Sequence, residues 1–298
     1  MTYSAEQLEA MADALVASGD YRVVRRLKPR LGITPPPGVA VRCGLVVDVE
    51  TTGLDPRRHE IIELAMTPFS YGLDGTVFMV GESFQALREP SEPISPEITA
   101  ITGITDAMVK GQVIDFNAVA RFAAPASLII AHNAAFDRRF LERFDQVFST
   151  KPWACSLSQV DWAAEGFEGV KLGDLGQAAG FFYDRHRAMN DCLATVELLA
   201  SPLPRSRVTG LSRLLDAARV PTWRIWAEHS PYELKDTLKA RGYRWNGDLG
   251  PLPRAWYIDV PDGQQEAELH FLKAEIYRRE IDLLVRRIDA HDRFSDRV

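Results

Sequence analysis

The chain has 298 residues, of which 46% are hydrophobic, and it carries a formal net charge of -6 at pH 7. At roughly 100–200 residues per domain, this length predicts about two domains. The acidic balance excludes a chain that is basic throughout, as many nucleic-acid-binding domains are, although local Lys and Arg can still contact phosphates.

The cysteines indicate a compartment rather than a site. Cys43, Cys155 and Cys192 are scattered without CxxC spacing, which argues against a disulfide framework or a zinc cluster and favours a reducing environment. The sequence has no run of about 18 apolar residues and does not start with the basic and apolar regions of a signal peptide. We therefore expect a cytoplasmic protein without a membrane segment.

Residues 1–40 are expected to form a helical extension followed by a proline-rich linker. Leu8, Met11 and Leu15 recur at helical spacing, and a second short segment of the same extension is expected to begin at Tyr21. The consecutive prolines at 35–37 lack backbone donors and predict a stiff linker.

Residues 41–202 predict an α/β domain, in which apolar strands come first and strands and helices then alternate. Strands are expected at 44–49, 60–67, 76–80 and 127–131. Helices are expected at 134–144, 172–179 and 191–200. The glycine-containing turn at 72–75 predicts an antiparallel hairpin, so the whole block is expected to be a mixed sheet with helices packed on it.

The remaining residues predict a linker at 203–222 and a small accessory α+β module at 223–298. Strands are expected at 223–227, 243–245, 255–260 and 282–288, although a longer helix fits the last of these nearly as well, and helices are expected at 230–241 and 264–279. Aromatic and basic residues interleave here, as in nucleic-acid-binding surfaces. A small module also needs large aromatics to build its core, and both interpretations stay open.

An apolar strand ends in two acids, Asp48 and Glu50, within the segment V-V-D-V-E-T-T-G. Side chains two residues apart on a strand point to the same side, and two like charges placed together require a compensating cation. Their oxygens suit Mg²⁺ or Mn²⁺. Two solvated acids at a strand end are the alternative interpretation.

Two further motifs carry acids at helix starts. Asp137, in H-N-A-A-F-D, is expected in a first helical turn, where a carboxylate favours the positive end of the dipole. In H-R-A-M-N-D, Asn190 or Asp191 is expected to cap a helix and His186 to lie in the preceding loop. Taken alone, each motif is typical of an ordinary helix N-terminus.

Together, the order D-x-E-T-T-G, H-N-x-x-F-D and H-x-A-x-x-D resembles the DEDDh-type 3′–5′ exonucleases, the superfamily of the DNA polymerase III epsilon subunit and ribonuclease T. The resemblance covers about residues 41–200 and implies a ribonuclease H-like mixed sheet flanked by helices. The segment I-T-G-I-T-D also resembles this family, but Thr102 replaces the usual His and Asp106 is given no role.

The resemblance also implies the chemistry of the site. Four carboxylates, Asp48, Glu50, Asp137 and Asp191, would hold two Mg²⁺ or Mn²⁺ ions, which stabilise the attacking and leaving oxygens. His186 would be the general base that takes a proton from water. The product would be a nucleoside 5′-monophosphate released from the 3′ end.

Substrate contacts are expected from residues that flank these acids: Thr51, Thr52, Leu54, Asn133 and Phe136. For Phe136, a place in the core is an equally good interpretation. The expected partner is single-stranded or 3′-end nucleic acid, DNA rather than RNA, and no protein partner or membrane is indicated.

The module shows no match to the polymerase-binding tail of the epsilon subunit, which favours a stand-alone repair or maturation nuclease. Two alternatives stay open. The first is a non-catalytic nucleic-acid-binding scaffold, whose signature would be the loss of one of the acids or of the histidine, and none is lost here. The second is a hydrolase of short oligonucleotides.

Overall fold

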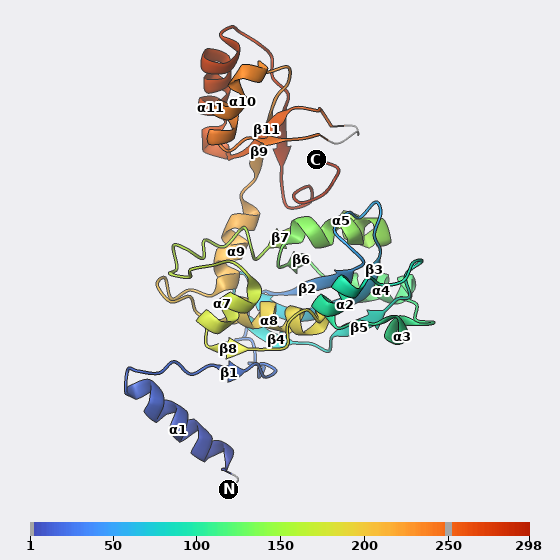
Figure 1. Ribbon diagram of the computed structural model, residues 1–298. Helices are drawn as coiled ribbons and strands as arrows, with labels where there is room; N and C mark the ends of the chain where they lie inside the picture. Colours follow the sequence, from blue (N-terminus) through green and yellow to red (C-terminus); the bar gives the residue numbers. More distant parts are fainter. Residues whose placement is uncertain (1–2, 248–251) are drawn as a thin grey trace.

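The computed structural model describes residues 3–247 and 252–298, and its centre is a six-stranded mixed sheet (Figure 1). The strand order is β4-β3-β2-β6-β7, with β5 paired to β3. The strands are β2 (Val41–Thr51), β3 (Ile61–Gly72), β4 (Val77–Val80), β5 (Phe84–Leu87), β6 (Leu128–Ala131) and β7 (Trp153–Cys155). β3 runs antiparallel to β2, β4 and β5. β6 runs parallel to both of its neighbours, β2 and β7. The predicted mixed sheet and its hairpin at 72–75 are therefore confirmed.

Helices cover both faces of this sheet (Figure 1). They are α2 (Pro96–Thr102), α3 (Asp106–Val109), α4 (Phe116–Ala123), α5 (Ala134–Phe144), α6 (Val147–Thr150), α7 (Leu172–Ala178), α8 (Ala188–Ala200) and α9 (Gly210–Arg219). Val46 packs in a core with α7, α8 and α9, and Val47 packs in a second core with α4, α5 and α6. Neighbouring strand residues point to opposite faces, so the continuous apolar run of β2 is explained by burial on both sides.

The N-terminal residues form a helix that projects from the molecule and a short strand that belongs to a separate two-stranded sheet. Helix α1 (Ala5–Ala17) is confirmed, begins with a capping box of Ser4 and Gln7, and buries none of its residues. The prediction of continued helix after Tyr21 is wrong, because β1 (Arg25–Arg26) pairs in parallel with β8 (Phe181–Phe182). Backbone pairing with a strand 156 positions away in the sequence decided this conformation, and local spacing gives no signal of it.

Helix α9 lies inside the residues expected to be a linker. Its leucines Leu211, Leu214 and Leu215 are buried in the core that contains α8, so this segment packs on the large sheet. The boundaries of the predicted domains stay predictions.

A four-stranded antiparallel sheet of order β10-β11-β9-β12 forms the C-terminal module, which stands apart from the large sheet in Figure 1. Its elements are β9 (Thr222–Ala227), 3-10 helix η1 (Tyr232–Leu234), α10 (Lys235–Ala240), β10 (Arg244–Trp245), β11 (Trp256–Pro261), 3-10 helix η2 (Asp262–Gln264), α11 (Gln265–Phe271), π-helix η3 (Leu272–Tyr277) and β12 (Val285–Ile288). The strand predicted at 282–288 is confirmed for 285–288. Part of the turn predicted between β10 and β11, residues 248–251, lies outside the described residues.

The last ten residues, 289–298, return from the module to the large sheet. The backbone N–H of Trp153 on β7 donates to the carbonyl of Ala290 at 2.7 Å, and Arg139 on α5 pairs with Asp296 at 2.5 Å. The module is thereby attached both through the chain after α9 and through this C-terminal segment. Within the described ranges, no helix combines the length and the apolar character needed to cross a membrane.

Candidate active site

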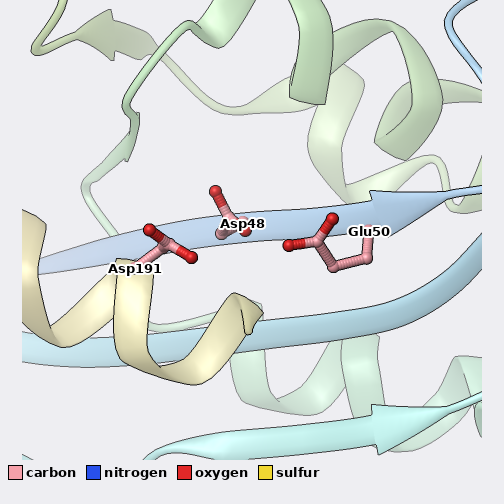
Figure 2. A group of neighbouring side chains, drawn as sticks. All are labelled: Asp48, Glu50 and Asp191. Atoms are coloured by element: carbon pink, nitrogen blue, oxygen red, sulfur yellow. The ribbon is translucent and has the colours of Figure 1, made fainter. Parts of the chain in front are cut away.

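Three carboxylates converge beside the end of β2 (Figure 2). Asp48 and Glu50 lie two residues apart on this strand and therefore share one of its sides, as predicted from the strand period. Oxygens of Asp48, Glu50 and Asp191 all lie within 4.8 Å of one another. Such a spacing permits all three groups to bind one cation.

Asp191 comes from the first turn of α8, which packs across β2 and β3. Its Oδ2 accepts a hydrogen bond from the backbone N–H of Arg187 at 3.2 Å, and its Oδ1 accepts one from the hydroxyl of Tyr183 at 2.8 Å. The prediction that Asn190 or Asp191 caps this helix is wrong, because α8 begins earlier, at Ala188, with Arg187 as its N-cap. Asp191 instead lies inside the first turn, and its carboxylate faces Asp48 (Figure 2).

Asp137 reaches the same strand from the first turn of α5, and only 2% of its surface is exposed. Its Oδ1 accepts a hydrogen bond of 3.2 Å from the backbone N–H of Val49, the residue between Asp48 and Glu50. Asp137 is not part of the group of three described above, but its charge raises the pKa of Asp48. The fourth predicted acid therefore lies beside the cluster and touches the strand that carries it.

The protein alone leaves these acids short of positive charge. Burial is the largest cause that raises the pKa of Asp48, followed by the charges of Asp137 and Asp191. Burial and the charge of Asp191 raise the pKa of Glu50 to about 8, and burial raises that of Asp137 to about 8. A bound cation would favour the ionised forms of all these groups.

Two residues of the predicted motifs adopt the left-handed backbone conformation that favours glycine. Asn133, at the start of α5, has φ 92°, and His186 has φ 59°. Such conformations cost about 1–3 kcal/mol each and cluster at functional sites. The His186 side chain is exposed, and its charge lowers the pKa of Asp191; this places the predicted base next to the carboxylate cluster.

Among the residues expected to contact substrate, the two threonines already use their hydroxyls in hydrogen bonds within the protein. The hydroxyl of Thr51 donates to the carbonyl of Gly53 at 2.7 Å, and that of Thr52 accepts from the backbone N–H of Glu60 at 3.0 Å. Both hydroxyls therefore hold the turn after β2. The same turn contains Gly53, where a side chain would not fit, because a Cβ there would lie 2.6 Å from the ring of His59.

The other three candidates lie around the site with different exposure. Leu54 is 80% exposed, and Asn133 is also exposed. Phe136 is partly buried in the core and packs against Phe140 in a tilted arrangement, with ring centroids 5.0 Å apart. Their contact with substrate stays a prediction, and the contacts of Phe136 favour its alternative place in the core.

Sequence reasoning missed a buried ion pair that anchors the histidine loop. Glu63 on β3 is fully buried and lies directly opposite Glu50 on β2. It accepts hydrogen bonds from the guanidinium of Arg187 at 3.0 Å and from the backbone N–H of Ala188 at 3.0 Å. The signal was a charged residue in the apolar run I-I-E-L-A-M, because a buried charge requires a partner.

Comparison with known proteins agrees with this geometry. The family model described as exonuclease matches residues 45–199, which include all four acids and His186. A DNA polymerase III subunit epsilon-like protein of Rhodobacter capsulatus is 33% identical over 177 residues, 56% of this chain and 25% of that protein. The DNA polymerase III subunit epsilon of Aquifex aeolicus is 27% identical over 161 residues, 52% of this chain and 77% of the relative.

Among solved structures, Exonuclease X in complex with 5′ overhanging duplex DNA is similar over 58% of this chain and 90% of its own, with 25% identity and a TM-score of 0.41. The chain spans only a quarter of the length of the Rhodobacter relative, and its residues 1–44 and 200–298 lie outside the match to the exonuclease family.

Proposed function

Because the chain belongs to the exonuclease family, we propose that it removes nucleotides one at a time from the 3′ end of DNA and releases nucleoside 5′-monophosphates. The earlier resemblance to exonucleases of the epsilon and ribonuclease T superfamily is confirmed by this match. The observation that carries the proposal is the convergence of Asp48, Glu50 and Asp191 within 4.8 Å, with Asp137 beside them. DNA is the proposed polymer because the relatives are named for DNA polymerase III.

The donor set fits divalent metal ions. All four groups are carboxylates, the ligands that Mg²⁺ and Mn²⁺ prefer, and their raised pKa values indicate that they need a nearby cation to ionise fully. We propose that Asp48, Glu50 and Asp191 hold one ion and that Asp137 helps to hold a second. When bound, two ions stabilise the negative charge that develops on the attacking and leaving oxygens.

The two remaining proposed roles are proton transfer from the attacking water and contact with the DNA strand. His186, whose side chain is exposed, accepts a proton from the attacking water, the usual role of histidine as a general base. The water oxygen then bonds to phosphorus, and the bond from phosphorus to the 3′ oxygen of the preceding nucleotide breaks. That oxygen takes up a proton from solvent and His186 releases its proton to solvent, so the net reaction consumes one water. The proposed contact with the terminal base is Leu54, whose exposed side chain is free to take part in it.

The test is the degradation of single DNA strands labelled at the 5′ end. We expect a ladder of products shortened from the 3′ end in Mg²⁺ or Mn²⁺, and none in chelator. Asp48→Asn should abolish the ladder because it removes a charge from the cation site while keeping the shape of the side chain.

The matched control is Asp20→Asn, the same change at an exposed acid in the N-terminal extension. This variant should degrade DNA as the unchanged protein does. Intact strands under every metal condition would refute the proposed activity and favour a non-catalytic scaffold. An RNA strand of the same sequence, tested in parallel, measures the preference for DNA. A substrate limit of a few nucleotides would favour the short-oligonucleotide hydrolase.

A further inference from the structure

A large cavity separates helix α5 from the C-terminal module. Its volume is about 1160 Å³, and its lining comes from both the large sheet's helices and the small sheet. Six arginines line it against three aspartates, although the chain as a whole is acidic. The arginines are Arg57, Arg139, Arg143, Arg224, Arg244 and Arg293. A cleft with such an excess of one charge concentrates ligands of the opposite sign.

The module contributes the face of its sheet that its own helices leave uncovered. Ile225 and Val260 point to the other face and pack with α10 and η3. On the face toward the cavity, Arg224 and Arg244 both pair with Asp259, at 2.7 and 2.9 Å. Their guanidinium carbons lie 4.5 and 4.9 Å from the ring centre of Tyr257. An ordered arrangement of two arginines around an aromatic ring suits phosphates and bases.

Helix α5 contributes the opposite wall and connects it to the carboxylate site. Ala135, Arg139 and Arg143 follow one another at four-residue spacing, so they form a stripe along one side of α5. The stripe begins two residues before Asp137, whose carboxylate contacts β2. Figure 1 shows α5 on the side of the large sheet that faces the module. Arg143 is exposed and makes no side-chain hydrogen bond or ion pair within the described residues.

We propose that this cleft binds the single-stranded DNA that leads to the 3′ end held at the carboxylates; this inference rests on the proposed exonuclease function. The strand would run along the arginine stripe of α5, its phosphates paired with Arg143 and Arg244. The exposed Trp245, on the edge strand β10, offers a surface on which a base can stack. The module thereby extends the substrate site from the terminal nucleotide to the strand behind it.

The test is the binding of a fluorescent DNA strand of about 20 nucleotides, which exceeds the ~4–16 nucleotide footprint of many single-strand-binding modules. Anisotropy is measured on the full chain in chelator, so that no hydrolysis occurs. Loss of two phosphate contacts in the double variant Arg143→Gln, Arg244→Gln should lower the slope of log affinity against log salt by about 1.4, at ~0.7 per contact. At about 0.1 M salt, this corresponds to roughly 25-fold weaker binding.

A matched control removes the same charge from arginines outside the cavity. Arg121 on α4 and Arg279 in the module are exposed and do not line it, so Arg121→Gln, Arg279→Gln should leave affinity and salt slope unchanged. Equal losses in both double variants, or no loss in either, would overturn the proposal. Tighter binding of an RNA strand of the same sequence would also overturn it. Absence of binding to any strand would overturn it as well and would favour a protein as the ligand of the cleft.

A second measurement separates this inference from the proposed function. If both hold, the cleft variant should hydrolyse a dinucleotide at an unchanged kcat/KM and lose kcat/KM on the long strand. If no strand is hydrolysed, the exonuclease proposal fails, while the binding experiment still decides whether the cleft holds DNA. Normal hydrolysis of long strands by the cleft variant would refute the DNA-binding role of the cleft and leave the exonuclease proposal intact.

Discussion

Arg138 follows the catalytic candidate Asp137 on helix α5, and its guanidinium donates a hydrogen bond of 2.6 Å to the carbonyl oxygen of His291. The same guanidinium donates to the carbonyl of Arg293 at 2.6 Å and pairs with Glu142 at 2.7 Å, and its side chain is fully buried. Consecutive residues of one helix therefore face two parts of the molecule. Asp137 contacts the strand of the carboxylate site, and Arg138 fixes the segment that returns from the module.

Replacement of Arg138 by alanine should destabilise the protein strongly. The change removes the side-chain donor to the Arg293 carbonyl and one of the donors to the His291 carbonyl and to Glu142. Breaking a buried charged network typically costs about 3–5 kcal/mol. We expect the midpoint of urea denaturation to fall clearly. The control is Arg139→Ala, which removes a partly exposed pair with Asp296 and should cost at most about 1 kcal/mol. Equal midpoints for the two variants would show that the Arg138 contacts contribute little.

Tyr183 is a positioning residue for Asp191, because its hydroxyl donates to Asp191 Oδ1 at 2.8 Å. Tyr183→Phe removes this hydrogen bond to a charged group, worth about 1.5–3 kcal/mol. We expect kcat to fall by about tenfold, at ~1.4 kcal/mol per factor of ten. The concentration of Mg²⁺ that gives half-maximal activity should rise, a change that a purely structural role would not cause.

The control for Tyr183 is Tyr277→Phe, which removes a hydrogen bond to the Glu228 carbonyl in the module. It should leave both kcat and the Mg²⁺ requirement unchanged. A Mg²⁺ requirement that stays the same in Tyr183→Phe would contradict the positioning role, whatever happens to kcat.

The sequence predicted the parts of the site that depend on local geometry. Asp48 and Glu50 share a side because the strand period is two, and that holds wherever the strand lies in the fold. The arrival of Asp191 at the same place depends on how α8 packs across β2, so only the resemblance to a family indicated it. The mixed sheet was predictable for a similar reason, because apolar runs and turns are local signals.

Contacts between distant segments were not predictable. The pair of Glu63 and Arg187 joins residues 124 positions apart, and an arginine beside a helix start resembles any solvated one. Arg138 also has the sequence signature of an exposed helix residue, yet the C-terminal segment covers it completely. In both cases, burial comes from a second segment whose position no periodicity encodes.

The pair of Glu63 and Arg187 should show strong coupling in a double-mutant cycle. Arg187→Gln leaves the buried Glu63 carboxylate without its cation, directly opposite Glu50. Adding Glu63→Gln removes that uncompensated charge, so the double variant should be more stable than Arg187→Gln alone. We expect a coupling energy of about 0.5–3 kcal/mol from urea denaturation of the four proteins. Additive effects of the two changes would show that the ion pair contributes no specific interaction.

The proposed base gives the most direct test of the chemistry. His186→Asn removes the imidazole, and asparagine tolerates the left-handed conformation of this residue better than most side chains. We expect kcat on DNA to fall by about 10²–10⁴-fold, the usual contribution of a positioned acid or base, with strand affinity in chelator unchanged. His229 in the module is also exposed and has φ 55°, so His229→Asn makes the same change in a similar backbone without touching the site. Wild-type kcat in His186→Asn would exclude this histidine as the base, whereas equal losses in both variants would indicate a general effect on folding.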